Sequence, residues 1–177
     1  MRRVSWSTLF LGLLVSSSES VHAAPQQVLN KTISWSYTVQ STLRDLDGKT
    51  RSVQTGINYT VYVSSAGRFF ERSSRSSGGK TQGGDQGVGA TQNGIGEARD
   101  IHFEGNKLVS LRGYATGAAR TIVSFDSSFS SCTVDLIVGR ENGVIRRKGI
   151  DGVTREILSS SMSGQSCSIR QGNAFAN

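Results

Sequence analysis

The sequence predicts an all-β fold: an antiparallel meander of about nine or ten strands, forming a small barrel or a two-layer sandwich, with one disulfide. Three observations predict it. Apolar and polar residues alternate with a period of two, turn dipeptides recur at short intervals, and the chain has one proline and no helical periodicity. Alternation with one polar face is typical of sheets that turn one face to a core and the other to water.

The alternation places the strands along the chain. The segment 51–63 is long for one strand, so we expect a bend or bulge near Gly56. Asp47-Gly48, Gly105-Asn106 and Asp151-Gly152 predict tight turns. A serine-rich connection around Phe129 joins the two strands of a central hairpin within 120–140. The other expected strands are 30–40, 51–63, 68–74, 98–104, 107–114, 144–148, 153–159 and 164–171.

One segment, 76–96, lacks the alternation. It is rich in glycine, and its only sizeable apolar side chains are Val88 and Ile95. Such a segment buries too little apolar surface to offset the entropy lost on ordering. We therefore predict a flexible loop here, between strands of the same domain.

The first 24 residues have the layout of a secretory signal peptide. Two arginines follow the initial Met, residues 9–15 form an apolar stretch too short to span a bilayer, and small residues precede Pro25. We therefore expect residues 1–24 to be removed. Residues 25–177 would then form a single β-domain, exported to the periplasm or the extracellular space.

The charge balance is basic with or without the predicted signal peptide. Removing it takes Lys+Arg from 20 to 18 and Asp+Glu from 13 to 12, so the net charge changes from +7 to +6. A basic chain favours anionic partners in general.

The two cysteines predict one disulfide. Cys132 and Cys167 each stand in phase with the apolar residues of a predicted strand, and two cysteines in an exported chain usually pair. The bond would close a loop of about 35 residues and stabilise the fold by roughly 3–4 kcal/mol in the chain-entropy description.

No catalytic or metal-binding motif is assembled in the sequence. His102 is the only histidine after the predicted signal peptide, and it alternates with Asp100 and Glu104 on the polar face of a strand. This pattern allows a metal or acid–base cluster, but a solvated strand face is the simpler interpretation. No nucleotide-binding loop or nucleophile elbow is present. We therefore predict no catalytic residues, metal or cofactor, and no nucleotide partner.

The basic residues offer the best candidate contacts. Arg68, Phe70 and Arg72 share one face of a predicted strand, where guanidinium groups beside an aromatic ring suit an anionic polysaccharide or lipid headgroup. A second basic run, 146–148, precedes a turn with Arg155 beyond it. Ordinary solvated charge is the alternative for both groups.

The functional prediction is an exported, non-enzymatic β-domain that binds an anionic or envelope-associated ligand, or serves as an envelope component. Two alternatives remain open from the sequence. One is a small secreted hydrolase that uses acidic residues or His102, and the other is a small outer-membrane β-barrel.

Overall fold

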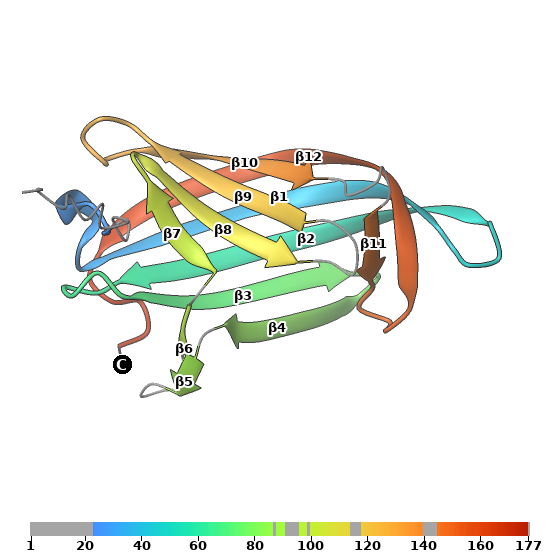
Figure 1. The fold of residues 1–177 in the computed structure, drawn as a ribbon, viewed down its shortest axis with the longest axis horizontal. Coiled ribbons are helices and arrows are strands. Elements are labelled where there is room, and N and C mark those ends of the chain that lie inside the picture. Colours follow the sequence, from blue (N-terminus) through green and yellow to red (C-terminus); the bar gives the residue numbers. More distant parts are fainter. Residues whose placement is uncertain are drawn as a thin grey trace, which may run out of the picture.

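The computed structural model describes residues 23–86, 88–90, 96–98, 100–113, 118–139 and 145–176 (Figure 1). The predicted signal peptide lies outside these residues, apart from its last two positions. The elements are η1 (Gln26–Val28), β1 (Lys31–Arg44), β2 (Thr50–Val63), β3 (Phe69–Ser77), β4 (Lys80–Gln86), β5 (Val88–Ala90), β6 (Gly96–Glu97), β7 (Ile101–Glu104), β8 (Lys107–Gly113), β9 (Ala118–Phe125), β10 (Cys132–Gly139), β11 (Ile145–Lys148) and β12 (Thr154–Gln171).

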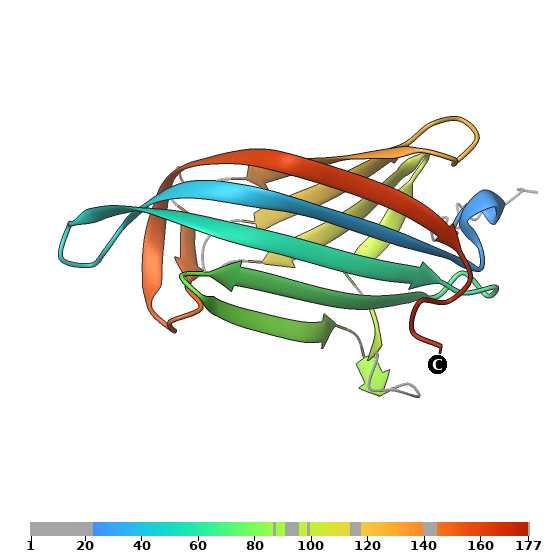
Figure 2. The same ribbon diagram turned by 180° about the vertical axis from the view of Figure 1, so that it is seen from behind.

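The strands form two antiparallel sheets, which confirms the all-β prediction. The larger, eight-stranded sheet has the order β11-β12-β1-β2-β3-β6-β5, with β4 paired to β3. It curves into a half-barrel, seen from behind in Figure 2. The four-stranded sheet, in the order β10-β9-β8-β7, lies against the inner side of the half-barrel (Figure 1). The domain is therefore a two-layer structure in which one layer is a half-barrel.

The first and the last long strands of the domain, β1 and β12, are neighbours in the half-barrel. β12 pairs antiparallel with β1, from Lys31 opposite Gln171 to Arg44 opposite Glu156. β1 also pairs with β2 without interruption from Lys31 to Arg44. The longest strands therefore lie side by side, and their inner residues form one wall of the interior.

The inner face of β1 follows the period-two alternation of its apolar residues. Along β1 the side chains of Ile33, Trp35, Tyr37 and Val39 are all buried. Opposite them, the small sheet contributes apolar residues from β7, β8, β9 and β10. The resulting core spans both sheets.

An aromatic row fills the core at the end of the molecule near η1. Phe103 lies 5.9 Å from Phe69 and 5.9 Å from Phe125, measured between ring centroids, and Phe125 lies 5.2 Å from Phe129. Such rings bury large apolar areas, and their contacts add to the stability gained by burial. This end of the interior is therefore well packed.

The predicted disulfide is present. Cys132 in β10 and Cys167 in β12 are bonded, with their Cα atoms 5.6 Å apart. The bond joins the small sheet to the half-barrel, at a place where the two sheets share no strand pairing.

The C-terminal region is one long strand, where the sequence analysis predicted two at 153–159 and 164–171. β12 runs without a break, although its pairing with β1 shifts register between Ser36 and Thr38. Gly164 lies opposite this shift with a φ of +62°. A glycine in this conformation absorbs an extra residue as a bulge, so the strand continues past it.

Of the bend or bulge predicted near Gly56, the bulge is absent. The registers of β2 with β1 and with β3 are continuous through it. Gly56 lies opposite Ser76 of β3, and a Cβ at this glycine would lie 3.0 Å from the Ser76 Oγ. The glycine therefore permits close cross-strand packing.

The structure also differs from the predicted loop at 76–96. β4 pairs with β3 from Ser77 opposite Lys80 to Glu71 opposite Gln86. Gly78 and Gly79, with φ of +56° and +74°, make the turn between them. The prediction relied on apolar side chains, whereas this hairpin extends an existing sheet through backbone hydrogen bonds. Positions 87 and 91–95 of the segment lie outside the described residues.

Candidate ligand-binding site

A cavity of about 660 Å³ is lined by residues of both sheets, away from the aromatic row. We call it the inter-sheet cavity. The inner side chains that line it are smaller, among them Ser41, Ser73, Gly84, Ala119 and Thr121. The sheets therefore enclose space that side chains do not fill, and its volume is within the range of small-molecule sites.

The inter-sheet cavity has a mixed lining, in which apolar side chains from both sheets stand beside polar ones. The Tyr37 and Thr121 hydroxyl groups lie 2.9 Å apart and connect β1 to β9. The Ser41 and Ser160 hydroxyl groups lie 3.0 Å apart and connect β1 to β12. Apolar side chains from both sheets form one part of the wall: Val39, Ile57, Ala119, Leu136, Val138 and Ile157. Another part is polar and includes Arg75, Gln82 and Lys148, and the Arg75 guanidinium donates to the Gln82 side chain.

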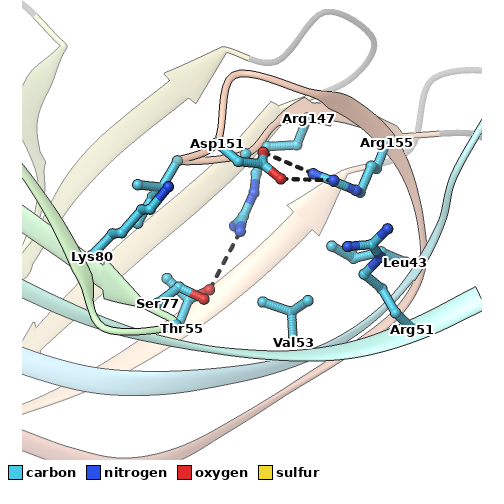
Figure 3. A pocket seen from close by; sticks show the side chains of 12 residues that line it. Leu43, Arg51, Val53, Thr55, Ser77, Lys80, Arg147, Asp151 and Arg155 are labelled. Carbon is cyan, nitrogen blue, oxygen red and sulfur yellow. Dashed lines mark hydrogen bonds and ion pairs between the residues drawn. The ribbon is translucent and has the colours of Figure 1, made fainter.

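A second, smaller pocket of about 230 Å³ lies beside it, and we call it the cationic pocket. Its lining includes four cationic side chains: Arg51 from β2, Lys80 from β4, Arg147 from β11 and Arg155 from β12 (Figure 3). Arg147 also lines the inter-sheet cavity, so it stands between the two spaces.

Two acidic residues balance two of the four cations. The Arg155 Nε lies 2.5 Å from Asp45 Oδ1, and its Nη2 lies 2.7 Å from Asp151 Oδ2. Arg51 also pairs with Asp45. The Arg155 side chain is only 8% exposed, so the paired carboxylates compensate a nearly buried charge.

These ion pairs shift the ionisation of their members. The hydrogen bond from Arg51, helped by Arg155, holds the pKa of Asp45 below its ordinary value against the opposing effect of partial burial. The hydrogen bond between Arg155 and Asp151 likewise lowers the pKa of Asp151. The same hydrogen bond raises the pKa of Arg155. The network is therefore fully charged at neutral pH.

Arg147 and Lys80 have no acidic partner among the residues that the structure describes. The single hydrogen bond of the Arg147 guanidinium is a long one, 3.5 Å from Nη2 to the Thr55 Oγ1. Figure 3 shows both cationic side chains extending into the pocket, from different strands. Since Arg147 is half-buried, a bound anion would supply charge compensation that the described residues do not.

The residues predicted from the sequence as ligand contacts lie elsewhere, at the outer face of the half-barrel. Arg68 is exposed in the turn before β3, and Phe70 lies 6.2 Å from the Tyr62 ring centroid. The Arg72 guanidinium carbon lies 5.4 Å from the Phe175 ring centroid, so it contacts the C-terminal tail. Alternation did place Phe70 and Arg72 on one face. Their role as ligand contacts stays a prediction.

His102 also faces outward. Its Nε2 lies 3.0 Å from Glu104 Oε1, and both side chains are substantially exposed. Among the described residues, no group of three or more His, Cys, Asp or Glu side chains could hold a metal ion. Within the same residues, no helix is long and apolar enough to cross a bilayer.

The basic run 146–148 was predicted from the sequence as a group, without saying which of its side chains face the interior. In β11, Ile145 is buried, Arg146 is exposed and Arg147 is half-buried. Alternation with Ile145 was the available signal that Arg147 faces inward. Four residues are a short pattern, and only the pairing of β11 with β12 fixes the face.

Comparison with models of protein families finds no family that matches this chain, and comparison with curated proteins finds no similar sequence.

Proposed function

We propose that the chain is an exported, non-enzymatic β-domain that binds an anionic ligand in the cationic pocket. The observation that carries the proposal is Arg147, a half-buried guanidinium with no acidic partner among the described residues, facing a pocket that it shares with Lys80. Guanidinium groups hold carboxylate and phosphate oxygens through paired, charge-assisted hydrogen bonds, which favours ligands that carry one of these groups.

Two further features support the proposal. The pocket is bounded by strands from separate parts of the chain, so its cations are held by sheet pairing and not by a single loop. Arg51 and Arg155 are already paired to Asp45 and Asp151, which leaves the excess positive charge at Arg147 and Lys80. An anion would therefore bind without displacing an existing ion pair.

The test uses inorganic phosphate as the probe, with sodium chloride at equal ionic strength as the reference. Phosphate should raise the midpoint of thermal unfolding, since a ligand present at a hundred times its Kd stabilises the folded state by about 2.7 kcal/mol. Arg147→Gln and Lys80→Gln should each reduce this effect. Arg146→Gln is the matched control, because it removes the same charge from the exposed side of the same strand.

Two outcomes would overturn the proposed site. If phosphate stabilises no more than chloride does, the pocket is not an anion site. If the effect is lost in Arg68→Gln/Arg72→Gln and kept in Arg147→Gln, the ligand binds at the outer face instead. That second result would support the contacts predicted from the sequence, and an acidic polysaccharide would then be the partner to test.

A further inference from the structure

The cationic pocket and the inter-sheet cavity share one lining residue, Arg147. The cationic pocket is lined by four cationic side chains, whereas the inter-sheet cavity also offers apolar side chains from both sheets. A ligand whose anionic group contacts Arg147 can therefore direct its remaining atoms into the cavity. The chemistry of those atoms follows from the residues that line it.

The cavity walls favour an apolar group. Val39 and Ile57 line it from the half-barrel, Leu136 and Val138 line it from the small sheet, and Ile157 lines it from β12. The Tyr37 and Ser41 hydroxyls along the wall already have hydrogen-bond partners. Arg75 and Gln82, which also line the cavity, are hydrogen-bonded to each other. Beside the apolar residues, a polar group would lose its hydration for few new hydrogen bonds, whereas an apolar group gains by leaving water.

We propose that the ligand is an anionic amphiphile, with a carboxylate or phosphate group held by Arg147 and Lys80 and an alkyl chain in the inter-sheet cavity. This inference rests on the proposed function and specifies the class of ligand. The cavity volume of about 660 Å³ is large enough for a group well beyond a bare anion. Arg147 is suited to the boundary, since its aliphatic stem can line apolar surface while its head contacts the charge.

The experiment measures binding of alkyl phosphates of increasing chain length, from inorganic phosphate to dodecyl phosphate, by isothermal titration calorimetry below the concentrations at which they form micelles. Affinity should rise with each methylene, by up to about fourfold, the change expected for full burial of the group. Laurate should bind in the same way, because the site recognises charge and chain. Dodecyltrimethylammonium, with the same chain and the opposite charge, should not bind.

Two pairs of variants assign the parts of the ligand to the two spaces. Val138→Trp fills the cavity and should abolish the dependence on chain length while leaving phosphate binding intact. Ile137→Trp is its control, because Ile137 is on the same strand and the residue is 51% exposed. Arg147→Gln should weaken every anionic ligand, and Arg146→Gln should weaken none. If Val138→Trp fails to fold, Ile57→Phe fills the cavity from the opposite sheet.

The outcomes separate this inference from the proposed function. If phosphate binds through Arg147 but affinity is independent of chain length, the proposed function stands and the amphiphile is excluded. If an uncharged dodecyl maltoside binds as tightly as dodecyl phosphate, the headgroup assignment is wrong. If neither phosphate nor any alkyl phosphate binds, both proposals fail.

Discussion

At the scale of single residues, Arg155 shows how the fold keeps a charge in its interior. Its side chain is 8% exposed, and it contacts Asp45 from the β1–β2 turn and Asp151 from the β11–β12 turn. A buried charge without partners would be strongly destabilising, so the carboxylates allow this arginine to bring two distant turns together. In this network Asp45 and Asp151 pair with Arg51 and Arg155, and neither pairs with Arg147.

Replacing Arg155 should therefore destabilise the protein in a pH-dependent way. The pKa values of Asp45 and Asp151 are lowered in the folded state, so the pairs contribute stability above the unfolded value of about 3.9. This contribution is lost as pH falls through the lowered folded values. Arg155→Gln should unfold more easily than wild type at pH 7, and the difference should shrink below pH of about 4. Urea unfolding across this range measures it.

The control for this prediction is Arg44→Gln. Arg44 pairs with Glu156, but its side chain is 47% exposed, so its loss should cost less than about 1 kcal/mol. A stability difference between Arg155→Gln and wild type that stayed constant from pH 7 to pH 2 would contradict the role given to the carboxylates.

At the scale of elements, β4 shows that a strand can form from residues with little intrinsic preference for one. Gly83 and Gly84 lie in its middle, and glycine weakens a strand interior. The turn at Gly78 and Gly79 holds β4 beside β3, and the pairing of Arg75 with Gln82 joins the two strands. Glycine at position 84 also leaves space along the cavity wall.

Gly84→Ala should stabilise the protein by about 0.4–1 kcal/mol, because alanine reduces the freedom of the unfolded chain. A Cβ at this position meets nothing within 4 Å, so the folded state should accommodate it without strain. Gly152→Ala is the contrasting variant. Its φ of +82° disfavours any side chain, and we expect a loss of about 1–2 kcal/mol. Urea unfolding should give opposite signs for the two, and equal signs would contradict the explanation.

The disulfide links two strands that share no backbone pairing, β10 and β12. Replacing Cys132 and Cys167 together by alanine should lower the free energy of unfolding by roughly 3–4 kcal/mol, because the unfolded chain regains the freedom of the closed loop. The exposed neighbours Thr133 and Ser168 provide the control double alanine variant, which should change stability by less than about 0.5 kcal/mol. Equal urea midpoints for the cysteine variant and wild type would contradict the prediction.

At the scale of the whole molecule, the domain has one tightly packed end and one hollow end. The aromatic row fills the first, and a separate small cluster of Leu43, Ile145 and Ile157 lies at the second. The inter-sheet cavity lies at the hollow end, where its lining includes Tyr37 and Ile157. The aromatic core and the inter-sheet cavity therefore lie at different ends, so a change in the cavity need not disturb the aromatic core.

The sequence predicts that the domain is exported and that its signal peptide is removed, which would lower the mass of the exported protein. The mature protein should begin near Ala24 or Pro25, and intact-mass measurement of the exported protein checks this. Placing an arginine in the apolar stretch, as in Leu11→Arg, should keep the chain at full length inside the cell. Exported protein that retains residues 1–24 would contradict the assignment.

The sequence by itself determined what depends on neighbours along the chain. The faces of β1, β2 and β10, and the turns at Gly48 and Gly152, follow from period-two alternation and local backbone preferences. The disulfide followed as well, since only two cysteines were available to pair. Alternation and turns depend on neighbouring residues, and two cysteines allow only one intramolecular pairing. Each of these features can therefore be predicted from a single sequence.

Only the tertiary structure decided how the strands divide into two sheets and what lies between them. β12 pairs with β1 across most of the chain's length, and such long-range pairing leaves no local signature. The inter-sheet cavity exists because small side chains from distant strands, such as Ser41 and Ala119, meet across it. Arg147 became a candidate contact for the same reason: its acidic neighbours are paired to Arg51 and Arg155, and that pairing is settled only when the turns meet in space.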